Sequence, residues 1–232
     1  TRVPLLFNDT NDKKFIICYD PARSRDNSII TVFEIYYDED DGWKLRIVNC
    51  VNMVDISNKR RAPMQTPDQV EYLRQLILDY NGDALEYQNI EAIFIDAGAG
   101  GAGKVIADML MQDWVDSKGR THRGVIDKET DQQLGTGYSR KYPNAIDKVK
   151  LIEPGKYKAI MYEEAIEMTN NNLVSFTSDY DNKGYLTIFQ TDDKETAKVI
   201  KVVCVLCYLL MYYILFWNMP YYSKVLNIFI TP

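Results

Sequence analysis

The sequence predicts an α/β fold with a mixed sheet, in which an antiparallel meander is followed by parallel strands and flanking helices. Two observations lead to this class: apolar runs typical of strands open the chain, and a later run of the same kind alternates with segments of helical period. The 232 residues, 46% of them hydrophobic, suffice for one sizeable core. We expect one domain over residues 1–198 and an apolar tail over residues 199–232.

Three segments of strand character come first. Residues 15–20 form an apolar run closed by Pro21, and residues 28–37 form a second, longer run. An acidic turn at residues 38–42 leads into residues 43–56, where apolar and polar side chains are interleaved. The short connections between these segments predict a three-stranded antiparallel meander.

The period then changes from strand to helix. Thr66 is the expected N-cap, Pro67 stands at the first helical position, and Asn81-Gly82 ends the helix. Residues 90–96 read as a buried strand. An order of strand, helix and strand predicts a parallel pairing through a right-handed crossover.

Later elements are less regular. The glycine-rich residues 97–103 lead into a helix expected to carry Ile106, Met109 and Leu110 on one face. Residues 114–142 are polar and predicted to be irregular. A further helix over about 156–168 carries Ile160, Met161 and Ile166, and short strands are expected at 173–176 and 185–189.

Charge and cysteine usage narrow the function classes. The formal net charge of -6 argues against a protein that coats nucleic acid through its overall charge. Residues 118–158 are nevertheless basic, which indicates either a solvated face or a surface that meets phosphates. The four cysteines lack the spacing of a secreted disulfide framework, so we expect a reducing, cytoplasmic setting. Cys204 and Cys207 have the spacing of a redox or zinc motif but no second ligand pair.

The tail differs in composition from the rest of the chain. Residues 202–223 form an uncharged run of aliphatic and aromatic side chains, long enough to span a bilayer. Pro220 and the many tyrosines argue against a transmembrane helix, so a membrane partner is not expected. A buried terminal helix, or a segment foreign to the fold, remain alternatives.

Two acidic residues stand in the same local pattern. Asp20 and Asp96 each end an apolar strand and are each followed by a residue that breaks the strand. Ligands bind beyond the carboxyl ends of strands in open α/β sheets, so two such acids on neighbouring parallel strands would converge there. Two close carboxylates repel each other unless a cation lies between them, and Mg²⁺ prefers such hard oxygen ligands. For each Asp alone, a turn or cap role is the alternative.

Several short motifs also occur in one order along residues 1 to about 190: Tyr19-Asp-Pro-Ala22 with Asp26-Asn-Ser28, Phe94-Ile-Asp-Ala-Gly-Ala-Gly-Gly101, Ile106-Ala-Asp108, Trp114 and His122-Arg-Gly-Val-Ile-Asp127. Together they resemble the C-terminal nuclease domain of terminase large subunits, the DNA-packaging motors of tailed phages. The resemblance implies a ribonuclease-H-like fold and Mg²⁺- or Mn²⁺-dependent cleavage of double-stranded phage DNA. It also implies that Asp20 and Asp96 are catalytic metal ligands, and that the full-length protein meets the terminase small subunit and the portal in the host cytoplasm.

The chain departs from this family in two respects. The family's third catalytic acid belongs to an Asp-rich helix near the C-terminus, and nothing in residues 199–232 matches it. Whether Asp179 or Asp181 replaces it stays open. The preceding ATPase domain is also missing, and the chain opens at Thr1 in mid-pattern, so we expect a piece of a longer protein. A catalytically incomplete remnant that still binds DNA is therefore the alternative function.

Two further sets of residues bear on phosphate binding. The segment from Gly98 to Lys104 has the spacing of a phosphate-binding P-loop, but Val105 replaces the Mg²⁺-binding hydroxyl, which makes nucleotide hydrolysis the weaker alternative. Within the basic segment, we expect Arg123, Arg140 and Lys141 to contact the DNA backbone. His122, the sole histidine, is either a surface residue or a contact at the rim of the site.

Overall fold

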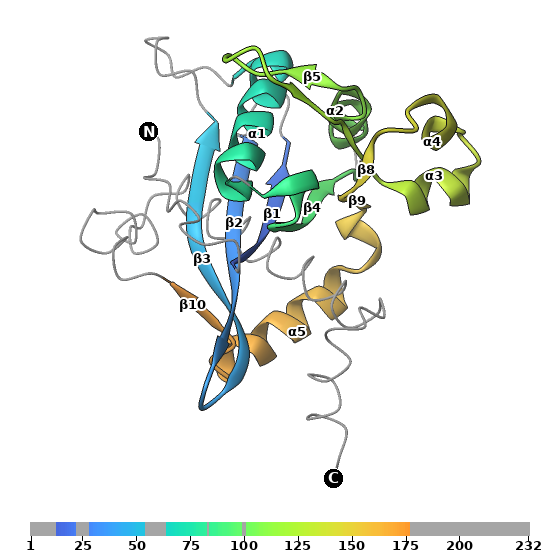
Figure 1. The fold of residues 1–232 in the computed structure, drawn as a ribbon. Coiled ribbons are helices and arrows are strands. Elements are labelled where there is room, and N and C mark those ends of the chain that lie inside the picture. Colours follow the sequence, from blue (N-terminus) through green and yellow to red (C-terminus); the bar gives the residue numbers. More distant parts are fainter. Residues whose placement is uncertain (1–12, 22–27, 54–63, 83, 99–100, 177–232) are drawn as a thin grey trace, which may run out of the picture.

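A six-stranded mixed sheet, in the order β10-β3-β2-β1-β4-β9, lies at the centre of the molecule (Figure 1). The computed structural model describes residues 13–21, 28–53, 64–82, 84–98 and 101–176. The strands of this sheet, in chain order, are β1 (Lys14–Asp20), β2 (Ser28–Asp38), β3 (Gly42–Met53), β4 (Ile90–Asp96), β9 (Val149–Ile152) and β10 (Val174–Phe176).

The first three strands form the expected antiparallel meander. Asp20 pairs with Ile29 and Lys14 pairs with Ile35, so β2 begins at the end of the sheet where β1 finishes. Strand β3 returns alongside β2 from Gly42 to Met53, and residues 54–56 of the predicted strand lie outside the described ranges. The turn between β2 and β3 therefore lies at the opposite end of the sheet from Asp20.

Parallel pairing extends the sheet on both sides of the meander. Strand β4 lies beside β1 and runs parallel to it, as the sequence predicts, and β9 lies parallel to β4 on its other side. Strand β10 is parallel to β3 at the far edge. The three strands β1, β4 and β9 therefore have their carboxyl ends at the same end of the sheet.

Helices cover both faces of the sheet. Helices α1 (Thr66–Asn81) and α2 (Ala102–Leu110) pack on one face, where Leu73 and Ile106 join Ile17 and Ile93 in one buried cluster. Helix α5 (Lys158–Asn170) packs on the other face, where its buried methionines meet Cys18 and Phe94. The result is a three-layer α/β arrangement with flanking helices (Figure 1).

Some helical details differ from the sequence-based expectation. Gln65, not Thr66, is the N-cap of α1, because a helix tolerates Pro67 anywhere in its first turn and can begin one residue earlier. Met109 is 36% exposed, since the buried stripe of α2 runs through Ile106 and Leu110. On α5, Ile160 and Ile166 face solvent, whereas the buried positions are Met161, Ala165 and Met168.

The segment predicted to be irregular contains short regular elements. We call residues 114–147, which separate α2 from β9 in the chain, the insert lobe. Its elements are β5 (Trp114–Val115), β6 (Thr121–His122), β7 (Val125–Ile126), α3 (Lys128–Leu134), α4 (Tyr138–Lys141) and β8 (Ile146–Asp147). Its strand β5 lies near α1 and α2, whereas its helices α3 and α4 extend outward past β9 (Figure 1). Two short 3₁₀ turns elsewhere, η1 (Leu85–Tyr87) and η2 (Pro154–Lys156), precede β4 and α5.

Several expectations fall on residues outside the described ranges. These are the strand at 185–189, Asp179 and Asp181, the cysteine pair at 204 and 207, and the whole tail over 199–232. Across the ranges that are described, no helix combines the length and the apolar character needed to cross a membrane.

Candidate metal centre

Asp20 and Asp96 end two strands that are direct neighbours. The preceding residues, Tyr19 and Ile95, are register partners in the parallel pair of β1 and β4. Each Asp is the last residue of its strand, so both carboxylates lie at the same end of the sheet, where β1 and β4 finish. The structure thus brings together the two acids that the sequence singled out.

Both carboxylates also belong to the same face of the sheet. Side chains alternate between faces along a strand, so Asp20 shares a face with Cys18, and Asp96 shares one with Phe94. Cys18 and Phe94 both lie in the cluster buried under α5. We therefore assign the two aspartates to the α5 side of the sheet, each with a half-buried side chain.

The environment of Asp96 orients its carboxylate and disfavours its charge. Burial raises the pKa of Asp96 above its ordinary value, while a backbone hydrogen bond from Gly98 acts in the opposite direction. The N–H of Gly98 donates to Asp96 Oδ1 at 2.7 Å. A half-buried carboxylate of this kind is stabilised in its charged form by a nearby cation.

The glycine-rich segment after β4 brings α2 close to the strand end. A Cβ at Gly103 would lie 2.0 Å from the carbonyl oxygen of Asp96, so a larger residue would push α2 away. Lys104, which a P-loop would direct to phosphate, instead pairs with Glu153, and the Val105 side chain is exposed. The close packing of α2 against β4 is therefore enough to account for a glycine at position 103, and no bound nucleotide is needed to explain it.

The donor set suits a hard cation but is small. Two carboxylates, completed by water and substrate oxygens, are a ligand set that Mg²⁺ uses in phosphate-processing sites. Within the described ranges, no group of three or more His, Cys, Asp or Glu side chains is arranged to hold a metal ion. The residues present therefore fit Mg²⁺ or Mn²⁺ with two protein ligands.

Glu153 is an acid at the same end of the sheet as Asp20 and Asp96, and the sequence analysis did not single it out. It follows β9 directly and precedes Pro154, which repeats the pattern of a strand, an acid and a breaker found at Asp20. Ile152 belongs to the α5-side cluster, so alternation directs Glu153 away from that face. Its carboxylate meets Lys104 at 3.5 Å and Lys156 at 2.6 Å.

Comparison of the chain with protein-family models, with curated proteins and with solved structures finds no match.

The three predicted DNA contacts do not form one group. Arg123 braces the insert lobe, because its Nε donates to the carbonyl of Asn144 at 2.6 Å and its guanidinium pairs with Glu86 of η1. Arg140 and Lys141 stand together in the last turn of α4 and are exposed. Both side chains can therefore reach a ligand, and the Lys141 ammonium lies 5.1 Å from the centre of the Tyr142 ring.

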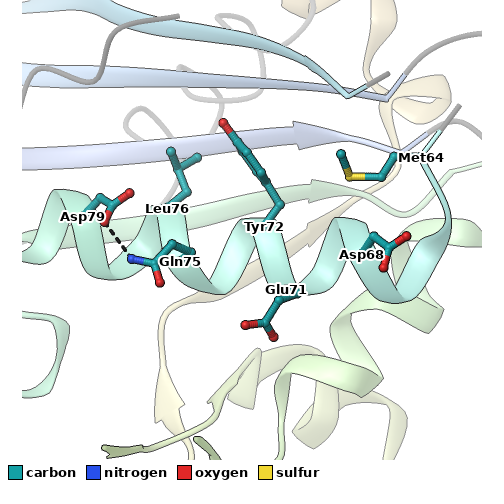
Figure 2. A pocket seen from close by; sticks show the side chains of 7 residues that line it. All are labelled: Met64, Asp68, Glu71, Tyr72, Gln75, Leu76 and Asp79. Carbon is teal, nitrogen blue, oxygen red and sulfur yellow. Dashed lines mark hydrogen bonds between the residues drawn. The ribbon is translucent and has the colours of Figure 1, made fainter. Parts of the chain in front are cut away.

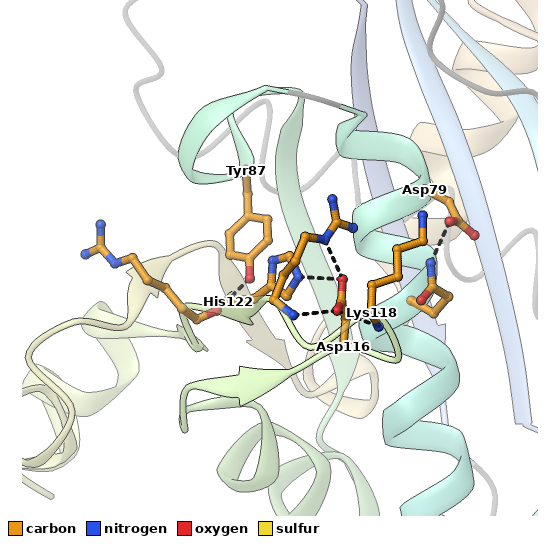
Figure 3. A network of polar contacts seen from close by, with 8 residues as sticks. Asp79, Tyr87, Asp116, Lys118 and His122 are labelled. Atoms are coloured by element: carbon orange, nitrogen blue, oxygen red, sulfur yellow. Dashed lines mark hydrogen bonds and ion pairs between the residues drawn. The ribbon is translucent and has the colours of Figure 1, made fainter.

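His122 has a structural partner. The hairpin of β5 and β6 is organised around Asp116, whose carboxylate lies 3.1 Å from His122 Nε2 (Figure 3). It also accepts from Arg120 Nε at 2.9 Å and from the backbone N–H of Lys118 at 2.9 Å. Burial by itself would raise the pKa of Asp116, but these hydrogen bonds together hold it well below its usual range.

A groove of about 330 Å³ lies along α1 (Figure 2). Tyr72 and Leu76 extend from α1 toward the strands in this view. Asp68, Glu71 and Asp79 also line it, which makes it a poor site for phosphate. None of the residues expected to carry chemistry lies there.

Proposed function

We propose that this chain is the nuclease domain of a terminase-like large subunit, a metal-dependent endonuclease that cleaves double-stranded phage DNA during packaging. One observation carries the proposal: Asp20 and Asp96 end adjacent parallel strands and belong to the same face of the sheet. A meander extended by parallel strands on the β1 side supports the ribonuclease-H-like fold that the sequence resemblance implies.

Within this proposal, the two aspartates bind the cation and the surrounding backbone fixes them. Mg²⁺ or Mn²⁺, when bound, supplies an activated water and charge stabilisation of the leaving oxygen. Asp96 is held by the Gly98 N–H, so its carboxylate is oriented before substrate arrives. The close approach of α2 at Gly103 keeps that strand end in place.

The partners follow from the same proposal. The substrate is double-stranded DNA, and the terminase small subunit and the portal are partners of the full-length protein in the host cytoplasm. Arg140 and Lys141 are the remaining candidates for contacts with the DNA backbone, because both are exposed on α4.

Plasmid nicking in Mn²⁺ tests the proposal. We expect wild-type protein to nick supercoiled plasmid and the variants Asp20→Asn and Asp96→Asn to lose that activity. Asp40→Asn is the matched control, because Asp40 is exposed in the turn at the opposite end of the sheet. Undiminished cleavage by both site variants would sink the proposal.

A second candidate is a DNA-binding remnant without nuclease activity. It is favoured by the small donor set, since the described ranges offer no third metal-ligating side chain beside the two aspartates. This candidate predicts that the wild-type protein binds duplex DNA without metal and nicks no plasmid in Mg²⁺ or Mn²⁺. The same assay therefore separates the two functions.

A further inference from the structure

Two lysines form ion pairs with the same carboxylate, that of Glu153, at the end of the sheet where Asp96 lies. Lys104 of α2 and Lys156 of η2 reach the two oxygens of Glu153, at 3.5 Å and 2.6 Å. We call these three residues the lysine clamp. Two positive charges against one negative charge leave the clamp with a net positive charge.

The clamp lies next to the Asp96 strand end. The N–H of Ala97 donates to the carbonyl of Ile152 at 2.7 Å, which fixes the β9 end beside the β4 end. A Cβ placed on Gly98 would lie 2.9 Å from Asp96 Oδ1 and 3.5 Å from Pro154 Cδ. Pro154 directly follows Glu153, so the turn that carries the clamp borders the Asp96 carboxylate.

The lysines remain accessible despite their ion pairs. The side chains of Lys104 and Lys156 are 54% and 66% exposed, and that of Glu153 is 37% exposed. Exposed ion pairs are weak and exchange easily with other partners. A phosphate can therefore replace Glu153 as the partner of either lysine at little cost.

We propose that Lys104 and Lys156 bind DNA phosphates that flank the scissile position, and that Glu153 tempers their charge in the free protein. This inference rests on the proposed nuclease function, because it uses the Asp20 and Asp96 edge as the place of cleavage. It assigns Glu153 to the clamp and not to the metal. The ligand chemistry is the phosphodiester backbone of a duplex, recognised by point charges without base contacts.

If Glu153 were a metal ligand instead, its variants would behave differently from those of a clamp residue. As a metal ligand, Glu153 would be required for cleavage, and Glu153→Gln would lose nicking as Asp96→Asn does. As the counter-charge of the clamp, its neutralisation frees both lysines for phosphate. Glu153→Gln then binds DNA more tightly than the wild type and retains metal-dependent nicking.

Fluorescence anisotropy with a short labelled duplex, in EDTA and over a series of KCl concentrations, tests the clamp. We expect Lys104→Gln and Lys156→Gln each to weaken binding about three- to tenfold at low salt, and to reduce the slope of log K against log salt by about one. Lys104→Arg keeps the charge and should bind as the wild type does. Glu153→Gln should shift affinity in the opposite direction to the lysine variants.

Lys13→Gln is the matched control. The Lys13 side chain is 40% exposed and pairs with Glu34, and Lys13 directly precedes β1 at the end of the sheet opposite Asp20. Its loss should leave affinity and salt slope unchanged.

The clamp is overturned if both lysine variants bind with wild-type affinity and slope, or if Glu153→Gln fails to bind more tightly. These binding measurements contain no metal, so they stand apart from the plasmid assay. A protein that binds through the clamp but never nicks would refute the nuclease proposal alone.

Discussion

The backbone N–H of Leu151 donates a hydrogen bond to Asp127 Oδ2 at 2.8 Å. This bond joins the beginning of α3 to the edge strand β9. Asp127 is 6% exposed and also caps α3, because its Oδ1 accepts from the N–H of Thr130 at 2.9 Å. One buried carboxylate therefore attaches the insert lobe to the sheet.

Replacing Asp127 with alanine should destabilise the protein. The change removes the helix cap and leaves the Leu151 N–H without its partner, which together cost about 2–4 kcal/mol. Urea unfolding followed by circular dichroism measures the loss. Asp40→Asn, in the exposed β2–β3 turn, should leave the midpoint unchanged. Equal midpoints for Asp127→Ala and wild type would show that the lobe is attached by other contacts.

Gly103→Ala should also destabilise the fold, through steric overlap. The new methyl group would lie 2.0 Å from the Asp96 carbonyl oxygen, so α2 has to move, at about 1–3 kcal/mol. Gly155→Ala is a close control, since nothing lies within 4 Å of a Cβ there. If Gly103→Ala melts with the wild type, α2 does not depend on this close approach.

Asp96→Asn should stabilise the metal-free protein at neutral pH. Burial raises the pKa of Asp96 above 3.8, so folding disfavours its charged form, and wild-type stability falls as pH rises through the folded pKa. The amide removes this dependence while keeping an oxygen that accepts from Gly98. Urea midpoints of both proteins, measured without metal at pH 7 and below pH 4, should differ only at the higher pH. A stability difference of the same size at both pH values would contradict this account.

Asp116→Ala should loosen the β5–β6 hairpin without affecting the sheet. Its depressed pKa means that the folded state favours the carboxylate, so this contribution is present above 3.8 and is lost as pH falls through the folded pKa. Amide hydrogen exchange of Lys118 and Arg120 should accelerate, because both N–H groups donate to Asp116 Oδ1. Amides in β1 and β4 serve as internal references. Unchanged exchange in the hairpin would remove Asp116 from this role.

Local sequence signals located most strands of the sheet, because the polarity pattern that marks a strand depends only on residues next to each other in the chain. Residues 90–96 match β4 in full, since an apolar run with a polar end has few other solutions. The insert lobe was predicted to be irregular because its order comes from buried carboxylates. Asp116, Asp127 and Asp131 are each buried and hydrogen-bonded to backbone N–H groups, which composition alone cannot reveal.

For helix α5, too, the sequence pattern did not show which apolar side chains are buried. Its sequence carries apolar residues around much of its circumference, so periodicity did not decide which of them are buried. Packing against Cys18 and Phe94 selected Met161, Ala165 and Met168, and left Ile160 and Ile166 in solvent.

Local sequence patterns were enough to locate the two strands that end at Asp20 and Asp96, and the acid at the end of each. Those features follow from side-chain polarity and chain-breaking residues within a few positions. Three relations required the folded chain: the two strands are neighbours, both acids belong to the α5 face, and Glu153 at the end of β9 pairs with Lys104 and Lys156. These relations depend on sheet order and on the alternation of side chains across paired strands, which bring together residues far apart in the chain.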